Sequence, residues 1–225
     1  MRNSTPTNLA FPTSSSMPDL SGLSNQVMLT SILNSTLGPS SLSAIADYEI
    51  RMLSVHYTRL VDHALLEYEC ARVALNEVID RKGRFGPLVR AMCHMETCIT
   101  TTYRSARFAH GLTAQPSLRP QLRSHLDKLD VLRASRRGGS LKGVRDAIHH
   151  MDERIIKGHA SEGSNLCLHN HELTIYDYPI KEGVTEGITH TIKYIELAKW
   201  LKQLHKTSMV LATKGLQLAQ PDLYA

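Results

Sequence analysis

The sequence of 225 residues has no run of about 18 consecutive apolar residues, the length that a membrane-spanning helix requires. Its polar N-terminal region also lacks the charged-then-apolar layout of a secretory signal. We therefore expect a soluble protein with no membrane partner. The chain is long enough to bury a hydrophobic core as one domain, or as one domain with a tail.

Cysteine pairs and the common glycine motifs are missing as well. The four cysteines form no CxxC pair and no dense framework, which favours free thiols in a reducing cytoplasm over a disulfide scaffold. No Walker-type glycine loop and no GxSxG elbow is present. Nucleotide hydrolysis and serine hydrolase chemistry therefore have no support in the sequence.

Charge is nearly absent from the first 43 residues, where Arg2 and Asp19 are the only charged residues and Ser, Thr and Pro recur. Such a segment buries too little apolar surface to offset roughly 1–2 kcal/mol of backbone entropy per residue. The composition predicts three parts. They are a disordered Ser/Thr/Pro-rich N-terminal tail over residues 1–43, a helical bundle domain over 44–216 and a C-terminal tail over 217–225.

Within the domain, apolar residues recur with the period of amphipathic helices. The pattern predicts helices over residues 44–82, 85–111, 117–135, 140–158 and 186–215, the first of them either one long helix or two joined by a kink. Pro120 lies near the first turn of the third helix, and Ser140 is the expected N-cap of the fourth. Between residues 161 and 186 the period changes to alternation, which predicts a short β-hairpin-like insertion. The fold class is therefore all-α, an antiparallel bundle of four to five helices with that insertion.

Three residues of the fourth predicted helix suit chemistry on a phosphodiester. Asp146 and His150 lie four residues apart on one face, so the carboxylate can accept a hydrogen bond from the imidazole and orient it. The adjacent Arg145 carries a planar fork of donors that matches the oxygens of a phosphate. An oriented imidazole beside a phosphate clamp suits general acid–base catalysis.

This set of residues predicts cleavage of RNA without a cofactor or metal. One imidazole takes the proton of the ribose 2′-hydroxyl, whose oxygen attacks the adjacent phosphorus while Arg145 stabilises the developing charge. A second group must protonate the leaving 5′-oxygen. A homodimer that brings two copies of the motif together supplies it.

The pattern Arg145-Asp146-x-x-x-His150 on a late helix of an all-α bundle resembles the HEPN superfamily. The resemblance covers about residues 44–215 and implies a HEPN-like bundle, homodimerisation and metal-independent RNA cleavage by arginine and histidine. It also suggests a toxin or defence effector with an antitoxin or a nucleotidyltransferase-like partner. His149 stands where an acidic residue is usual, so His149 and His150 remain alternative catalytic histidines.

Basic residues gather directly before the motif. A positive cluster there would steer an RNA backbone toward the same place, although such a run is also typical of a solvated turn. The N-terminus of the helix at Ser140 adds backbone N–H groups that favour an anion. The predicted RNA-binding residues are Arg133, Arg136, Arg137 and Lys142.

Other interpretations stay open. In one, Arg145 and His150 belong to a structural ion-pair network, with Arg145 bonding Asp152 or Glu49, and the domain is a non-catalytic HEPN-like module that binds a partner protein or RNA. In another, Cys167-x-His169-x-His171 holds a metal with a fourth ligand from elsewhere, such as His159 or His190. Trp200 lies either in the core or on a surface for a partner helix.

Overall fold

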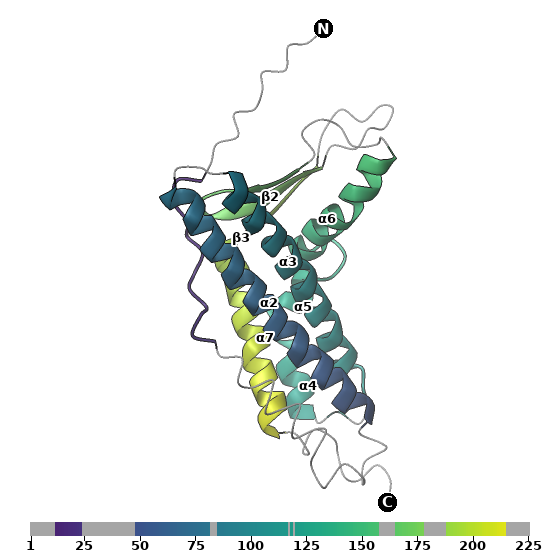
Figure 1. Cartoon of the computed structure of the whole chain (residues 1–225). Helices are drawn as coiled ribbons and strands as arrows, with labels where there is room; N and C mark the ends of the chain where they lie inside the picture. Colours follow the sequence, from purple (N-terminus) through teal and green to yellow (C-terminus); the bar gives the residue numbers. More distant parts are fainter. Residues whose placement is uncertain are drawn as a thin grey trace, which may run out of the picture.

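The computed structural model describes residues 12–23, 48–81, 85–116, 118, 120–157, 165–177 and 188–214. These residues form six helices and one three-stranded antiparallel sheet (Figure 1). The helices are α2 (Tyr48–Asp80), α3 (Phe85–Thr113), α4 (Pro120–Asp127), α5 (Asp130–Ala134), α6 (Ser140–Ile156) and α7 (Tyr194–Lys214). The strands are β1 (Asn165–Leu168), β2 (Glu172–Asp177) and β3 (Ile188–Lys193). None of the helices in these ranges is long and apolar enough to cross a membrane.

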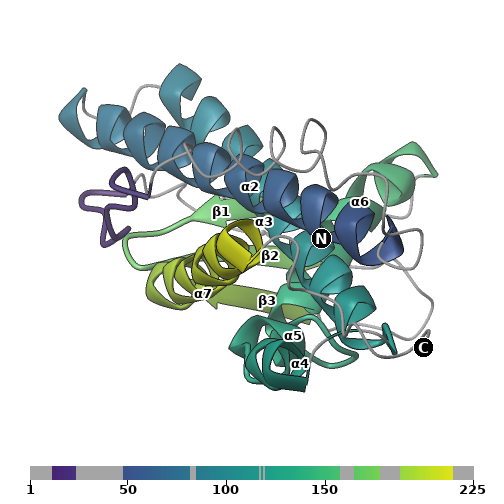
Figure 2. The ribbon, with the colours of Figure 1, turned by 90° about the horizontal axis from the view of Figure 1, so that it is seen from below.

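The two long helices α2 and α3 lie side by side and form the centre of the core (Figure 1, Figure 2). Their facing residues are fully buried, among them Leu75 on α2 and Met95 and Ile99 on α3. Helix α7 packs along α2, and the Tyr57 hydroxyl donates a hydrogen bond of 2.9 Å to the carbonyl of Leu204. The mostly helical class that the sequence predicts is confirmed at this level.

The sheet has the strand order β1-β2-β3, with β2 in the middle. Strands β1 and β2 form the hairpin that the alternating pattern predicts, and Leu173 and Ile175 of β2 are fully buried. The third strand is a correction, because the sequence assigned Ile188–Lys193 to the start of the last helix. Isoleucine and threonine make up most of that strand, and their branched β-carbons favour extended backbone. Helix α7 begins only at Tyr194.

The third predicted helix, over residues 117–135, begins at Pro120 in the structure, three residues later than expected, and is divided into α4 and α5. The break has a tertiary cause on α7. The Gln203 side chain accepts a hydrogen bond from the Asp130 backbone N–H at 3.1 Å and donates one to the Asp130 carboxylate at 3.0 Å. Lys199 adds an ion pair to the same carboxylate at 2.6 Å. These contacts with α7 favour a new helix start at Asp130. The sequence around Asp130 does not predict them, because their partners lie about 70 residues away.

Residues 12–23, which we name the strap, lie against the helical body (Figure 1). Met17 is 8% exposed and Leu20 is 2% exposed, so both belong to the core. The backbone N–H of Ser16 donates to the carbonyl of Asn170 at 2.8 Å. The predicted disorder is therefore wrong for the strap. The remainder of the predicted tails, residues 1–11, 24–43 and 217–225, lies outside the described residues.

A tight turn joins α5 to α6. The carbonyl of Gly139 accepts the first helical hydrogen bond, from the Gly143 N–H at 3.0 Å, so Gly139 rather than Ser140 caps the helix. A β-carbon on Gly139 would collide with the backbone carbonyl of Ala134. The start of α6 therefore depends on the absence of a side chain at this position.

We expect Gly139→Ala to lower the free energy of unfolding by about 1–3 kcal/mol, because the clash is with backbone and cannot be relieved by rotating a side chain. Denaturant unfolding followed by circular dichroism measures the change. Gly86→Ala is the matched control, because a β-carbon there meets no atom within 4 Å. Equal stability of the two variants would contradict the assignment.

Candidate functional site

Helix α6 presents one buried face and one solvent-facing face. Leu141 and Val144 are fully buried and Ala147 is nearly so, which places this side against α3, β2 and β3. Gly143 permits the close approach to β3, since a β-carbon there would lie 2.7 Å from Nδ1 of His190. The other face of α6 lies at the edge of the molecule (Figure 1).

Arg145 is held on two sides. Its Nη1 donates a hydrogen bond of 3.0 Å to Oδ1 of Asp146, and its guanidinium carbon lies 5.1 Å from the centre of the Tyr103 ring. A guanidinium over an aromatic face gains a cation–π attraction. The side chain remains 29% exposed. Among the described residues its hydrogen-bond acceptor is Asp146.

Asp146 pairs with its neighbours and not with His150. Lys142, four residues earlier, donates to Oδ2, and Arg145 donates to Oδ1. The predicted hydrogen bond from His150 is therefore not formed, because a permanently charged ammonium at the equivalent spacing occupies the carboxylate instead. Burial by itself raises the pKa of Asp146, but the hydrogen bonds and charges of Lys142 and Arg145 outweigh it and lower the pKa below its usual value.

His150 finds a different carboxylate. Its Nδ1 lies 3.4 Å from Oε2 of Glu153, and its side chain is 47% exposed. The ring of His149 lies next to it, with 5.5 Å between ring centres. Lys157 also binds Glu153, and this hydrogen bond is the main reason why the pKa of Glu153 is lowered. Both histidines thus reach solvent just past the middle of α6.

The five-residue spacing separates arginine and histidine in one protomer. At 3.6 residues per turn, five residues rotate by roughly 140° about the helix axis. Arg145 therefore leans toward Tyr103 and α3, while His150 extends from a different side of α6. One protomer brings together Arg145, Asp146, Lys142 and Tyr103, and leaves the histidine apart from them.

The predicted basic residues divide into two groups. Arg133, Arg136 and Arg137 are exposed, and Arg133 makes one weak ion pair with Asp130 at 3.7 Å. Lys142 is half-buried and is engaged by Asp146. The end of α5 and the turn before α6 therefore offer three arginines to an anionic partner, while the lysine has a structural role.

Tyr103 is the site residue that the sequence did not single out. It lies on α3 between Ile99 and Ala106 and fits the apolar period of that helix, so it is indistinguishable from a core residue. Only the packing of α6 on α3 shows that its ring supports the guanidinium of Arg145.

The alternative interpretations fare differently. Arg145 pairs with Asp146 and not with Glu49, whereas the side chain of Asp152 is not described. In the parts of the chain that the structure describes, no three His, Cys, Asp or Glu side chains gather closely enough to hold a metal ion, and His159 lies outside them. Trp200 is 6% exposed and belongs to the core.

Comparison with known proteins gives no match, whether to a family model, to a curated protein or to a solved structure. The HEPN-like fold and function remain predictions from the motif on α6. The roles of Arg145 and His150 are therefore inferred from the geometry of this helix and its neighbours.

We expect Asp146→Asn to lower the free energy of unfolding at pH 7 by about 0.5–1 kcal/mol, because two partly exposed ion pairs are lost. The lowered pKa means that this stabilisation is present above about pH 4 and is lost as the pH falls through the pKa of the folded state. Urea unfolding between pH 7 and pH 2.5 should therefore show the wild type and the variant converging. Asp127→Asn, at an exposed position on α4, is the control. A gap that is independent of pH would refute the assigned pairing.

Proposed function

We propose that this protein is a HEPN-like, metal-independent endoribonuclease that acts as a homodimer. The observation that carries the proposal is the pairing on α6. Arg145 and His150 both reach solvent, and each is held by a neighbouring carboxylate, Asp146 or Glu153. A basic turn directly precedes them in the chain. An oriented arginine and an oriented histidine are the groups that phosphodiester cleavage through the ribose 2′-hydroxyl needs.

The reaction balances with two histidines. The unprotonated imidazole of one His150 removes the proton from the 2′-hydroxyl, and the 2′-oxygen forms a bond to phosphorus. The bond from phosphorus to the 5′-oxygen breaks, and that oxygen takes a proton from the second, protonated histidine. The products are a 2′,3′-cyclic phosphate and a 5′-hydroxyl. Arg145 stabilises the negative charge that grows on the non-bridging oxygens.

Neighbouring side chains fix the two reacting groups. When Nδ1 of His150 carries the proton it donates to Glu153, which leaves Nε2 as the nitrogen able to accept a proton. Asp146 and Tyr103 limit the freedom of Arg145, so less conformational entropy is lost when it binds a phosphate. His149 lies next to His150 and is the alternative base.

The angle between Arg145 and His150 about the axis of α6 is our reason for proposing a dimer. Because one protomer directs these side chains roughly 140° apart, a second copy of α6 is needed to bring a guanidinium and two imidazoles to one phosphate. The proposal extends to a toxin or defence role in the cytoplasm, with an antitoxin or a nucleotidyltransferase-like partner. All four cysteines lie in the described residues, and none forms a disulfide, which suits a reducing compartment.

One observation favours a second candidate, a non-catalytic module that binds a partner protein or RNA. Asp146 and Tyr103 engage Arg145 without any ligand, as they would in a purely structural network. In that case Arg145 anchors α6 on α3, and its loss reduces stability instead of a reaction rate.

The test is cleavage of a labelled single-stranded RNA by the full chain in the presence of EDTA. Arg145→Ala and His150→Ala should each reduce the rate roughly 100-fold or more, because each removes a group that acts in the transition state. The cleaved ends should carry a 2′,3′-cyclic phosphate. His149→Ala distinguishes the two histidines.

The matched controls are Arg90→Ala and His63→Ala. Both residues are exposed on long helices, and each pairs with a glutamate as the site residues pair with carboxylates. Full cleavage by Arg145→Ala and His150→Ala in folded protein would rule out the ribonuclease. If Arg145→Ala is less stable than the wild type and the wild type cleaves no RNA, the result would support the non-catalytic module.

RNA binding gives a separate prediction. In the His150→Ala background, the double variant Arg136→Ala/Arg137→Ala should weaken binding and reduce the slope of log K against log salt by roughly 1.4, since two phosphate contacts are lost. Fluorescence anisotropy over a potassium chloride series measures the slope. Lys202→Ala/Lys206→Ala removes the same charge from the exposed side of α7. An equal change in both double variants would show that the arginines do not contact RNA.

A further inference from the structure

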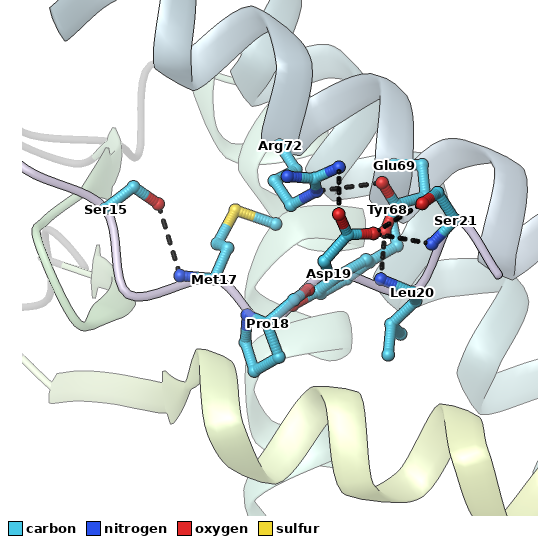
Figure 3. A network of polar contacts seen from close by, with 9 residues as sticks. All are labelled: Ser15, Met17, Pro18, Asp19, Leu20, Ser21, Tyr68, Glu69 and Arg72. Atoms are coloured by element: carbon cyan, nitrogen blue, oxygen red, sulfur yellow. Dashed lines mark hydrogen bonds and ion pairs between the residues drawn. The ribbon is translucent and has the colours of Figure 1, made fainter.

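Three side chains of α2 contact three consecutive residues of the strap (Figure 3). The Tyr68 hydroxyl donates to the carbonyl of Pro18 at 3.2 Å. Nη2 of Arg72 lies 3.3 Å from the carboxylate of Asp19. Oε1 of Glu69 accepts a hydrogen bond from the Leu20 backbone N–H at 2.6 Å. Each α2 side chain binds a different chemical group of the extended segment, namely a backbone carbonyl, an acidic side chain and a backbone N–H.

The strap also inserts two apolar anchors into the body. Met17 and Leu20, three residues apart, are buried in the hydrophobic core. The side chain of Asp19, which lies between them in the sequence, contacts Arg72 and is 61% exposed. Pro18 restricts the backbone between the anchors and favours the extended conformation. The recognised pattern is thus apolar-Pro-Asp-apolar.

Two of the α2 side chains that contact the strap also bind each other. Nε of Arg72 donates to Oε2 of Glu69 at 2.8 Å, a pair within one turn of α2 that fixes both side chains. Tyr68 is fully buried, and burial raises the pKa of its hydroxyl, which therefore stays protonated and donates. With the strap in place, the Pro18 carbonyl supplies the acceptor that a donor shielded from water needs.

The sheet supplies the other end of the surface. Asn170, in the turn between β1 and β2, accepts hydrogen bonds at its Oδ1 from the backbone N–H groups of Thr13 at 3.1 Å and Ser14 at 3.4 Å. Its backbone carbonyl accepts the N–H of Ser16. This is the one backbone-to-backbone hydrogen bond between the strap and the rest of the described chain. The strap therefore adds no strand to the sheet and is held mainly by side chains.

We propose that α2 and the β1–β2 turn form a peptide-binding site for an extended apolar-Pro-Asp-apolar segment, and that the strap is its ligand in cis, able to leave while the helical body stays folded. The twelve residues of the strap have no helix or strand of their own, and apart from Met17 and Leu20 only Pro12 is buried and Leu23 packs against the core. A segment held by a few buried side chains opens at lower cost than the core. Because the strap is tethered to the body through residues 24–47, its effective concentration is high and it excludes a competing peptide.

The experiment disables the strap in the full chain and supplies it again in trans. In the double variant Met17→Asp/Leu20→Asp the anchors cannot enter the core, whereas the α2 side chains are intact. A fluorescein-labelled synthetic peptide of residues 12–23 should bind this variant at least about tenfold more tightly than it binds the wild type, whose site is occupied. Fluorescence anisotropy measures both affinities, and far-ultraviolet circular dichroism checks the fold.

Arg72 identifies the site. Added to the double variant, Arg72→Ala should weaken the peptide about tenfold, because it removes the charged partner of Asp19. Arg59→Ala, at an exposed position earlier on α2, is the matched control and should leave the affinity unchanged. A folded double variant that does not bind the peptide, or that binds it equally well without Arg72, would overturn the proposal.

Hydrogen exchange of the wild-type chain decides the case in which the double variant fails to fold. The amides of Ser16 and Leu20 should show at least about tenfold less protection than those of Val61 and Leu65 in α2, since the strap opens without global unfolding. Equal protection of the strap and α2 amides would show that the strap unfolds only with the core, and the proposed peptide-binding site would be rejected.

Discussion

Helices α2 and α3 share a buried seam along most of their length, and the other elements take their places from this pair. Helix α7 packs on α2, whereas α4, α5 and α6 pack on α3. The sheet closes one end, and β1 contacts α3. Because close-packed interiors tolerate little change in shape, the surfaces that α2 and α3 offer on their outer sides are fixed with the same precision as the core.

Both candidate sites are built on those outer sides. Tyr103 of α3 supports the guanidinium of Arg145, and Tyr68 of α2 presents its hydroxyl to Pro18. In each case a long helix supplies an aromatic side chain whose position is set by core packing, and a more peripheral element supplies the charged or main-chain group. Rigid elements hold such groups more accurately than loops do.

Local signals in the sequence locate most of the helices, but they do not predict the features that depend on contacts with distant residues. The end of α2 before Lys82-Gly83, the entry into α4 at Pro120 and the start of α6 after Gly139 follow from glycine and proline chemistry. The break between α4 and α5 depends on Gln203, 73 residues away, and the order of the strap depends on Glu69, 49 residues from Leu20. Average composition correctly describes a segment with little apolar surface, but a few well-placed apolar side chains, Met17 and Leu20 among them, place it against the helical body.

The same limit applies to the candidate site. The sequence identifies α6 and its charged residues, because helical spacing alone shows which of them share a face. It does not decide which partner a carboxylate chooses when two lie at equal spacing, and Asp146 takes Lys142 instead of His150. Tyr103 is missed because a tyrosine on an apolar stripe looks like core until a second helix packs on it.

The strap and α6 lie far apart, at the left and at the right of the molecule in both views (Figure 1, Figure 2). Energetic coupling between distant sites needs an element with two alternative arrangements that both sites bias. The seam between α2 and α3 is fully buried at Leu75, Met95 and Ile99, and a close-packed interior resists small shifts. We therefore expect that release of the strap leaves the geometry around Arg145 unchanged.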